Sequence, residues 1–216
     1  MKRLIVYDLD GTLVDTLKDI TNAANFMLAK LQAPLLTAEK VRRFIGRGMH
    51  QLVGDCLGTQ DPERVAEGMR VYRAYYHEHL VDNSRLYPGA REVLEYFRLR
   101  AQAVISNKPN PYSKDLLKAL GVADYFLDII GGDSPYPRKP DPSSLKALMA
   151  RAEVSSDEAL LIGDSPIDVE TGHQAGVLTV SLMHGLADRD ELAAAGPDFI
   201  VDDFNRFLAL AKEQAW

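Results

Sequence analysis

Acidic side chains occur at close spacing in two parts of the 216-residue chain. Asp8 and Asp10 are two residues apart near its start, and Asp164 and Asp168 are four residues apart further on. Carboxylate oxygens are hard ligands of the type that Mg²⁺ prefers, and bound Mg²⁺ usually keeps several waters and takes phosphate oxygens as well. Carboxylates that gather without a cation repel one another and raise one another's pKa values. These residues therefore fit a divalent cation bound by Asp8, Asp10 and Asp164.

Other side chains in the sequence suit an anion. Gly11 removes a side chain where a backbone N–H can approach a negatively charged group. Thr12 and Ser106 offer hydroxyl donors, and Lys139 offers a compact positive charge that suits a phosphoryl oxygen. The sequence thus predicts a locally cationic phosphate site inside a chain whose formal net charge is −6.

Asp168 has two interpretations at this point. The segment Ser165-Pro166-Ile167-Asp168 has the pattern of a helix start, with serine at the N-cap and proline at the first helical position. Asp168 at the third position would then cap the helix. The same carboxylate would also be close enough to support the site around Asp164, and the sequence leaves both roles open.

Each chemically active group follows an apolar run or precedes an amphipathic one. The expected strands are Leu4–Tyr7, Ala101–Ser106, Phe126–Ile130, Ala159–Ile162, Val177–Val180 and Phe199–Val201. The expected helices between them are Ala90–Leu99, Tyr112–Leu120, Ser143–Ala152, Ile167–Ala175 and Asp203–Ala211. This alternation predicts an α/β fold, a doubly wound parallel sheet with crossover helices on both faces. Because parallel strands end along one edge, the groups that follow them are expected to converge.

Residues 16–85 interrupt the alternation. They show helical patterning over Thr16–Leu31, Val41–Leu57 and Glu63–Leu80, and no buried strand. Helices inserted directly after the first strand would lie over its carboxyl end, which is where open α/β sheets bind ligands. The sequence therefore predicts a core domain of residues 1–15 and 86–216 and a small inserted α-helical cap domain of residues 16–85.

Composition narrows the classes of partner. A net acidic chain lacks the basic field that nucleic acid binding requires, so no nucleic acid partner is expected. No stretch reaches the roughly 20 apolar residues of a membrane span. Cys56 is the only cysteine, so an intrachain disulfide is impossible. We expect a cytoplasmic monomer or homodimer that acts on a small molecule.

Four segments of the chain resemble, in order, the four motifs of the haloacid dehalogenase-like (HAD) hydrolase superfamily. They are Asp8-Leu9-Asp10-Gly11-Thr12-Leu13-Val14-Asp15, Ser106-Asn107-Lys108, Lys139-Pro140-Asp141 and Gly163-Asp164-Ser165-Pro166-Ile167-Asp168. The resemblance spans nearly the whole chain, and the inserted helices resemble the small helical cap of that superfamily. Three further segments are most similar to the phosphoglycolate phosphatase subfamily: Phe44–Gly48, Ser106–Pro111 and Tyr125–Asp133.

The resemblance implies a mechanism for these residues. Asp8 would attack phosphorus and form an aspartyl-phosphate, and Asp10 would protonate the leaving oxygen and later deprotonate the attacking water. Mg²⁺ would be held by Asp8, the backbone carbonyl of Asp10, and Asp164. Ser106 and Lys139 would stabilise charge on the transferring phosphoryl group.

The remaining site residues have supporting roles under the same resemblance. Gly11, Thr12, Ser106 and Asn107 would contact the phosphate, and Asp168 would orient Lys139 or a metal-bound water. In the cap, Arg47 could pair with a second anionic group of the substrate, such as a carboxylate.

The implied reaction is Mg²⁺-dependent hydrolysis of a small phosphomonoester, with 2-phosphoglycolate giving glycolate and phosphate as the first candidate. A pyrophosphatase and a broad sugar or nucleotide phosphatase stay open, because their core motifs would look the same. Asp10 disfavours a dehalogenase, which lacks a second aspartate. The cap pattern over Ile45–Leu52 disfavours a phosphomutase, and the helical insertion disfavours a non-catalytic phosphoacceptor domain.

Overall fold

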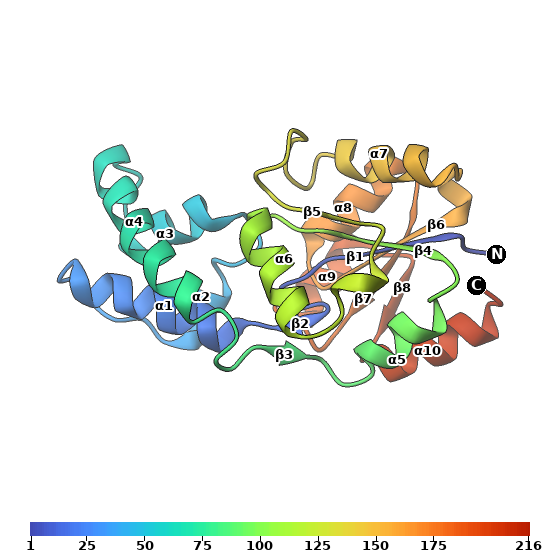
Figure 1. Cartoon of the computed structure of the whole chain (residues 1–216), viewed down its shortest axis with the longest axis horizontal. Coiled ribbons are helices and arrows are strands. Elements are labelled where there is room, and N and C mark those ends of the chain that lie inside the picture. The colour runs from blue at the N-terminus through green and yellow to red at the C-terminus, as the bar shows by residue number, and fades with distance from the viewer.

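A six-stranded parallel sheet forms the centre of the molecule, with strand order β5-β4-β1-β6-β7-β8 (Figure 1). The computed structural model describes residues 1–216. The strands are β1 (Leu4–Tyr7), β4 (Ala101–Ile105), β5 (Asp128–Ile130), β6 (Ala159–Gly163), β7 (Leu178–Leu182) and β8 (Phe199–Val201). Strand β1 lies between β4 and β6, so the chain winds outward from it in both directions. The expected doubly wound parallel sheet is confirmed.

Helices cover both faces of the sheet because its central strand is apolar on both sides. The helices are α5 (Ala90–Tyr96), α6 (Asn110–Ala119), α7 (Ser143–Ala152), α8 (Pro166–Ala175) and α10 (Phe204–Glu213). Leu4 and Val6 of β1 pack with apolar residues of α7 and α8, whereas Ile5 and Tyr7 pack with those of α5, α6 and α10. Figure 1 shows α7 and α8 on one side of the sheet and α5 and α10 on the other. Alternation along β1 thus supplies two separate cores.

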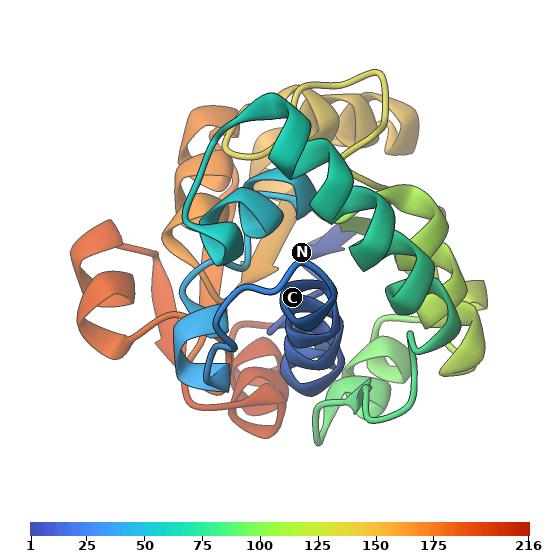
Figure 2. The same ribbon diagram turned by 90° about the vertical axis from the view of Figure 1, so that its left-hand side faces the viewer.

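Four helices, which we call the helical block, are inserted between residues 15 and 85 and lie at one end of the sheet (Figures 1 and 2). They are α1 (Leu17–Lys30), α2 (Ala38–Arg42), α3 (Met49–Leu57) and α4 (Pro62–Glu78). The short strands β2 (Val14–Asp15) and β3 (Arg85–Leu86) pair antiparallel, which holds the two connections to the block side by side. Asp19 strengthens this junction, because its carboxylate accepts hydrogen bonds from the backbone N–H groups of Asn83 and Ser84.

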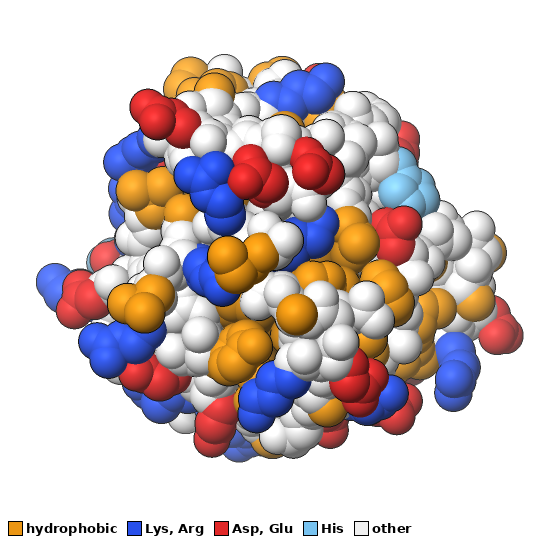
Figure 3. All heavy atoms as spheres, turned by 90° about the vertical axis from the view of Figure 1, so that its right-hand side faces the viewer, with side chains coloured by type: hydrophobic (Ala, Val, Ile, Leu, Met, Phe, Trp, Pro, Cys, Tyr) orange, Lys and Arg blue, Asp and Glu red, His pale blue; other side chains and the backbone are white.

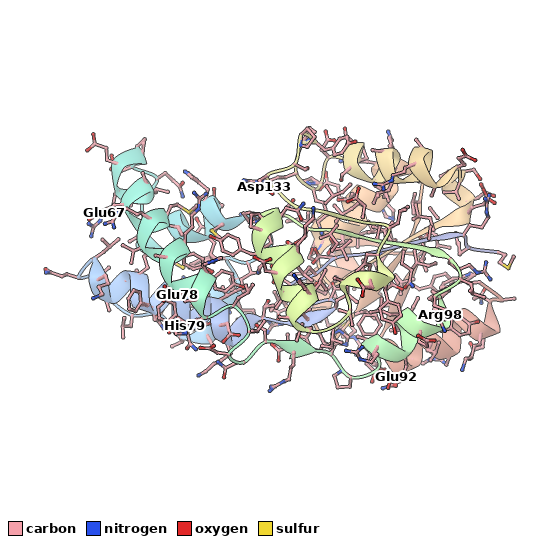
Figure 4. The ribbon with its side chains drawn as sticks, viewed as in Figure 1. Glu67, Glu78, His79, Glu92, Arg98 and Asp133 are labelled. Atoms are coloured by element: carbon pink, nitrogen blue, oxygen red, sulfur yellow. The ribbon has the colours of Figure 1, made fainter.

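Helix α4 shows how the sequence of the block specifies its packing. Asp61 caps the helix by accepting a hydrogen bond from the N–H of Arg64 at 2.9 Å. Tyr72 and Tyr76, one turn apart, are fully buried, and the Tyr76 ring packs against Tyr112 of the core. Glu67 and Glu78 are exposed and project from the other side of the helix (Figure 4). The amphipathic period therefore selects the face that is turned inward.

The expected continuous helix over Val41–Leu57 is wrong. The chain forms α2, then an irregular loop over residues 43–48, then α3. Gly46 and Gly48 have φ values of +109° and +92°, which residues with a side chain rarely adopt. The two glycines therefore break the helix and turn the loop toward the core. The pattern also missed helix α9 (Arg189–Ala195) and the β2–β3 pair, which are short.

The face of the molecule opposite the helical block carries basic, acidic and apolar side chains that are interspersed (Figure 3). Single apolar residues are exposed on the surface, such as Met1 and Leu99, as in most folded proteins. None of the helices combines the length and the apolar composition that crossing a bilayer requires.

Candidate active site

The carboxyl ends of β1 and β6 bring Asp8 and Asp164 together. Tyr7 pairs with Ile162 across the two strands, and the N–H of Asp8 extends the pairing by donating to the Ile162 carbonyl at 2.9 Å. Asp168 lies in the first turn of α8, which starts just after β6. Carboxylate oxygens of Asp8, Asp164 and Asp168 all lie within 4.8 Å of one another. Residues from distant parts of the sequence thus form one buried carboxylate cluster.

Both oxygens of Asp164 are held by neutral donors. The Thr12 hydroxyl donates to Oδ1 at 2.6 Å, and the backbone N–H of Leu186 donates to Oδ2 at 2.6 Å. Gly11, with φ of +89°, leaves space for this carboxylate that a Cβ atom would fill. The structure therefore places Gly11 and Thr12 against Asp164, and neither lines the cavity described below. The Leu186 contact was missed because a backbone amide leaves no signal in the sequence.

Lys139 lies between two of the carboxylates. Its Nζ donates to Asp8 Oδ1 at 2.6 Å and to Asp168 Oδ1 at 2.5 Å. The other oxygen of Asp168 accepts from the N–H and hydroxyl of Ser165, at 3.1 and 2.6 Å. Asp168 therefore has both of the roles that the sequence left open, since it caps α8 and also contacts Lys139.

Ser106 and Asn107 follow β4, the other neighbour of β1. The side-chain amide of Asn107 is fully used: Oδ1 accepts from Lys139 N–H, and Nδ2 donates to the carbonyls of Lys139 and Gly46, each at 2.9 Å. Asn107 thus fixes the segment that carries Lys139 and fastens the helical block to the core. The Ser106 oxygen accepts from the N–H of Lys108 at 3.2 Å, which leaves its hydroxyl hydrogen available to an anion.

Lys108 is the main site residue to which the sequence assigned no role. Its Nζ contacts both carboxylate oxygens of Asp10, at 2.8 and 2.9 Å, and lies 4.9 Å from the centre of the Tyr76 ring. Thr16 also donates to Asp10 at 2.7 Å. Lys108 is in the second motif, but the sequence does not indicate that this lysine is buried. A buried ammonium group therefore faces the helical block from the core.

A cavity lies between the core and the helical block. All the charged residues that line the cavity belong to the core, and the residues that line it from the helical block are uncharged. The lining residues are Asp8, Asp10, Ser106, Asn107, Lys108, Pro109, Lys139, Ser165 and Ile167 of the core and Ile20, Ile45, Gly46, Gly48, Met49, Leu52, Tyr72 and Tyr76 of the block. Arg47 is exposed and is not brought to this cavity. The nearby loop after β5 is fixed by Asp133 (Figure 4), which accepts from the N–H of Asn110 at 2.6 Å.

The side chains of the site are anionic as a set. Four carboxylates, those of Asp8, Asp10, Asp164 and Asp168, face the two ammonium groups of Lys108 and Lys139. Two negative charges are in excess, which is the charge that one divalent cation neutralises. The expectation of a locally cationic site is therefore wrong for the side chains alone, because the sequence did not show how the carboxylates and lysines pair.

The pKa values reflect this excess. Burial raises the pKa of Asp8 to about 7, and the charges of Asp168 and Asp10 add to the rise, although Lys139 opposes it. Burial, together with the charges of Asp8 and Asp168, raises the pKa of Asp164 well above its ordinary value. Burial disfavours the charged form of Lys139, but Asp168 and Asp8 outweigh that effect and raise its pKa. Buried carboxylate oxygens that lie this close together are suitable ligands for a hard divalent cation.

This cluster predicts a dependence of stability on pH and metal. Because the pKa of Asp8 is raised, the folded metal-free protein binds a proton that the unfolded chain has released, so its stability falls as pH rises from about 4 to about 7. Mg²⁺ needs the ionised carboxylate and is expected to raise the melting temperature more at pH 8 than at pH 5. Thermal unfolding with EDTA or MgCl₂ at both pH values measures this. An equal Mg²⁺ effect at the two pH values contradicts the assignment.

Comparison with known proteins agrees with the motifs and the fold. The model of the family described as haloacid dehalogenase-like hydrolase matches residues 5–182. A phosphoglycolate phosphatase of Vibrio parahaemolyticus is 31% identical over 99% of this chain and 97% of its own. One of Rhodospirillum rubrum is 36% identical over 94% of this chain and 88% of its own. The crystal structure of a predicted phosphoglycolate phosphatase from Haemophilus somnus has a TM-score of 0.92 and 30% identity, over 97% of this chain and 98% of that one.

The chain belongs to the haloacid dehalogenase-like hydrolase family. Within the family it is similar to phosphoglycolate phosphatases and is a phosphoric monoester hydrolase, as the motifs predicted. Phosphatases of this family generally use a divalent metal, and Asp8 and Asp164 lie, with Asp168, in a buried carboxylate cluster of the kind that can hold one.

Proposed function

We propose that the protein hydrolyses 2-phosphoglycolate to glycolate and phosphate with Mg²⁺ as cofactor. One observation carries the choice of substrate. Two cations line the cavity: Lys139, which is bound to Asp8 and Asp168 at the reacting centre, and Lys108, which is paired with Asp10 beside an uncharged wall of the helical block. A short substrate with an anionic group beyond its phosphate would place that group near Lys108. The names of the relatives support the same substrate.

The reaction has two displacements at phosphorus. In the first, a carboxylate oxygen of Asp8 attacks phosphorus, the bond between phosphorus and the ester oxygen breaks, and Asp10, which has to be protonated in the substrate complex, gives its proton to the leaving oxygen. In the second, water attacks phosphorus while Asp10 takes its proton, and the bond between phosphorus and Asp8 breaks. Phosphate leaves, and both aspartates return to their initial states.

The other residues prepare the site for these steps. Lys139 and Ser106 both line the cavity, and Lys139 contacts Asp8; both would bind the oxygens of the transferring group. Asp8, Asp164 and the backbone carbonyl of Asp10 would hold Mg²⁺. When bound, Mg²⁺ supplies the positive charge that lets an anionic nucleophile and an anionic phosphate approach each other.

The helical block would act as a cap. We propose that residues 16–85 form a separate cap domain and that residues 1–15 and 86–216 form the core domain, because the cavity has one wall from each. The block would exclude water and select the leaving group. A cytoplasmic location is part of the proposal, supported by the single buried cysteine, Cys56, which can form no disulfide within the chain.

A substrate screen tests the function. We would compare kcat/KM for 2-phosphoglycolate, pyrophosphate, sugar phosphates and nucleoside monophosphates, each with Mg²⁺ and with EDTA. The proposal predicts the highest value for 2-phosphoglycolate and no turnover in EDTA. A preference for pyrophosphate, or similar values for all substrates, would replace the proposal with the corresponding alternative.

Substitution of Lys108 tests the observation behind the substrate. In Lys108→Met, kcat/KM for 2-phosphoglycolate is expected to fall about 10- to 100-fold further than that for 2-hydroxyethyl phosphate, since only the first loses a charged hydrogen bond to its second anion. Both substrates have a poor alkoxide leaving group that Asp10 must protonate, so the loss of the contact between Lys108 and Asp10 affects both and largely cancels in the ratio. Arg47→Ala serves as the control, because this exposed arginine lies outside the cavity. An unchanged ratio in Lys108→Met would remove Lys108 from substrate recognition.

A further inference from the structure

Leu186 is in contact with both halves of the molecule. Its backbone N–H donates to Asp164 Oδ2 at 2.6 Å, and its carbonyl accepts from the Nε of Arg42 at 2.5 Å. Arg42 is the last residue of α2 in the helical block. A single residue of the core therefore joins a guanidinium group of the block to a carboxylate of the proposed metal site.

Arg42 also contacts the next two residues of the core. Its Nη2 donates to the carbonyl of Ala187 at 3.2 Å and pairs with Asp188 at 3.3 Å. Three successive residues of the core are thus held by one side chain, and two of those contacts are with carbonyl oxygens. The donors of a guanidinium group lie in one plane at fixed angles. These contacts therefore fix the orientation of residues 186–188 as well as their distance from α2.

The loop over residues 183–188, which we call the carboxylate loop, is packed tightly on Asp164. Gly185 lies so close that a Cβ atom there would overlap the Asp164 side chain. His184 stacks on Tyr87 with 4.0 Å between ring centres, and its Nε2 lies 3.2 Å from the carbonyl oxygen of Thr12. A shift of this loop would therefore be transmitted to Asp164.

Asp164 depends on few partners for its orientation. It is 1% exposed, and its carboxylate is held only by the Thr12 hydroxyl and the Leu186 N–H. Thr12 belongs to the loop after β1 and does not contact the helical block through this hydroxyl. Of the two donors, the Leu186 N–H is the one that Arg42 can influence.

We propose that Arg42 is a positioning residue for the metal. By holding Leu186 it keeps Asp164 directed at Asp8, so the affinity of the site for a divalent cation depends on how the helical block is seated on the core. The proposal rests on the proposed role of Asp164 as a metal ligand. Because coupling is reciprocal, metal binding would also favour the seated arrangement of the block.

Metal affinity without substrate tests the proposal directly. Calorimetric titration with MgCl₂ would compare the wild type with Arg42→Ala, Arg42→Lys and Arg43→Ala. Partners that orient a metal ligand typically change metal affinity 10- to 100-fold, so Arg42→Ala is expected to raise the Kd for Mg²⁺ about tenfold. Arg42→Lys should recover part of the loss. Arg43→Ala is the matched control, because Arg43, the residue after α2, is exposed and pairs only with Glu39 of that helix.

Two further measurements separate positioning from a general loss of structure. In EDTA, Arg42→Ala should keep the far-UV circular dichroism of the wild type and a single cooperative unfolding transition above the titration temperature, although it should melt below Arg43→Ala because its hydrogen bonds to the loop are lost. In ¹⁵N spectra of the wild type, the Leu186 amide and the Arg42 Nε–H signals should both shift as MgCl₂ is added. An unchanged Kd in Arg42→Ala would overturn the proposal, as would an Arg42 signal that does not respond to Mg²⁺.

The proposed metal role of Asp164 is tested separately by Asp164→Asn. If that variant bound Mg²⁺ as well as the wild type does, the assignment of the metal site would be wrong whatever Arg42 does. If Asp164→Asn lost Mg²⁺ and Arg42→Ala did not, the metal site would stand and the coupling through Arg42 would be rejected.

Discussion

Asp8→Asn is expected to abolish turnover, with a fall in kcat of at least about 10⁴-fold. An amide is not a nucleophile toward phosphorus, and the reaction has no second route once the covalent step is blocked. The substitution keeps the shape of the side chain. It also replaces a buried carboxyl group, whose pKa the protein raises to about 7, with a neutral amide. The fold should therefore survive, and circular dichroism with steady-state kinetics measures both outcomes.

Asp15→Asn provides the matched control for this substitution. Asp15 lies in β2 outside the cavity, where it pairs with Arg85 at 3.8 Å on the surface. The same chemical change there should leave kcat within about twofold, because an exposed ion pair contributes little. Asp8→Asn turnover within tenfold of the wild type would show that another group receives the phosphoryl group.

The second large effect is expected for Lys139→Met. The ammonium group lies between Asp8 and Asp168, at 2.6 and 2.5 Å, and all three side chains are buried. Its loss removes a charge beside the reacting phosphoryl group, for which we expect a fall in kcat of about 10³-fold. It also leaves two buried carboxylates without their cation, which typically costs about 3–5 kcal/mol of stability.

The stability of Lys139→Met should depend on pH in a defined direction. Without the lysine, which lowers the pKa of Asp8, the folded-state pKa of Asp8 rises further above that of the unfolded chain, so folding takes up protons. Stability is then highest in acid and is lost as pH rises toward neutrality. Urea unfolding in EDTA at pH 5 and pH 8 measures this. Lys146→Met is the control, because Lys146 is an exposed lysine of α7. A variant equally stable at both pH values would contradict the paired arrangement of Lys139.

The elements that position the site were predictable because each ends where a polar motif begins. Apolar runs buried on both faces specify parallel strands, and parallel strands bring Asp8 and Asp164 to one edge whatever their distance in sequence. The helical block was predicted as an interruption of the strand–helix alternation. Its internal boundaries were not, because the glycines at 46 and 48 act through backbone conformation, which hydrophobic periodicity does not record.

Three features of the site could not be derived from residue types. The contact of Leu186 with Asp164 is made by a backbone N–H, which every residue but proline possesses. The burial of Lys108 depends on how the block lies against the core, and this is a property of tertiary packing. Arg47 illustrates the converse, since a cation of the right type in the right segment is exposed outside the cavity.

Chemical trapping of the covalent intermediate tests the central claim most directly. The enzyme would be quenched during turnover of 2-phosphoglycolate and treated with borohydride, which reduces an acyl phosphate to the corresponding alcohol. Peptide mass spectrometry is then predicted to find homoserine in place of aspartate at position 8, and only there. Homoserine at another position, or no reduced residue in an enzyme caught in mid-turnover, would contradict transfer of the phosphoryl group to Asp8.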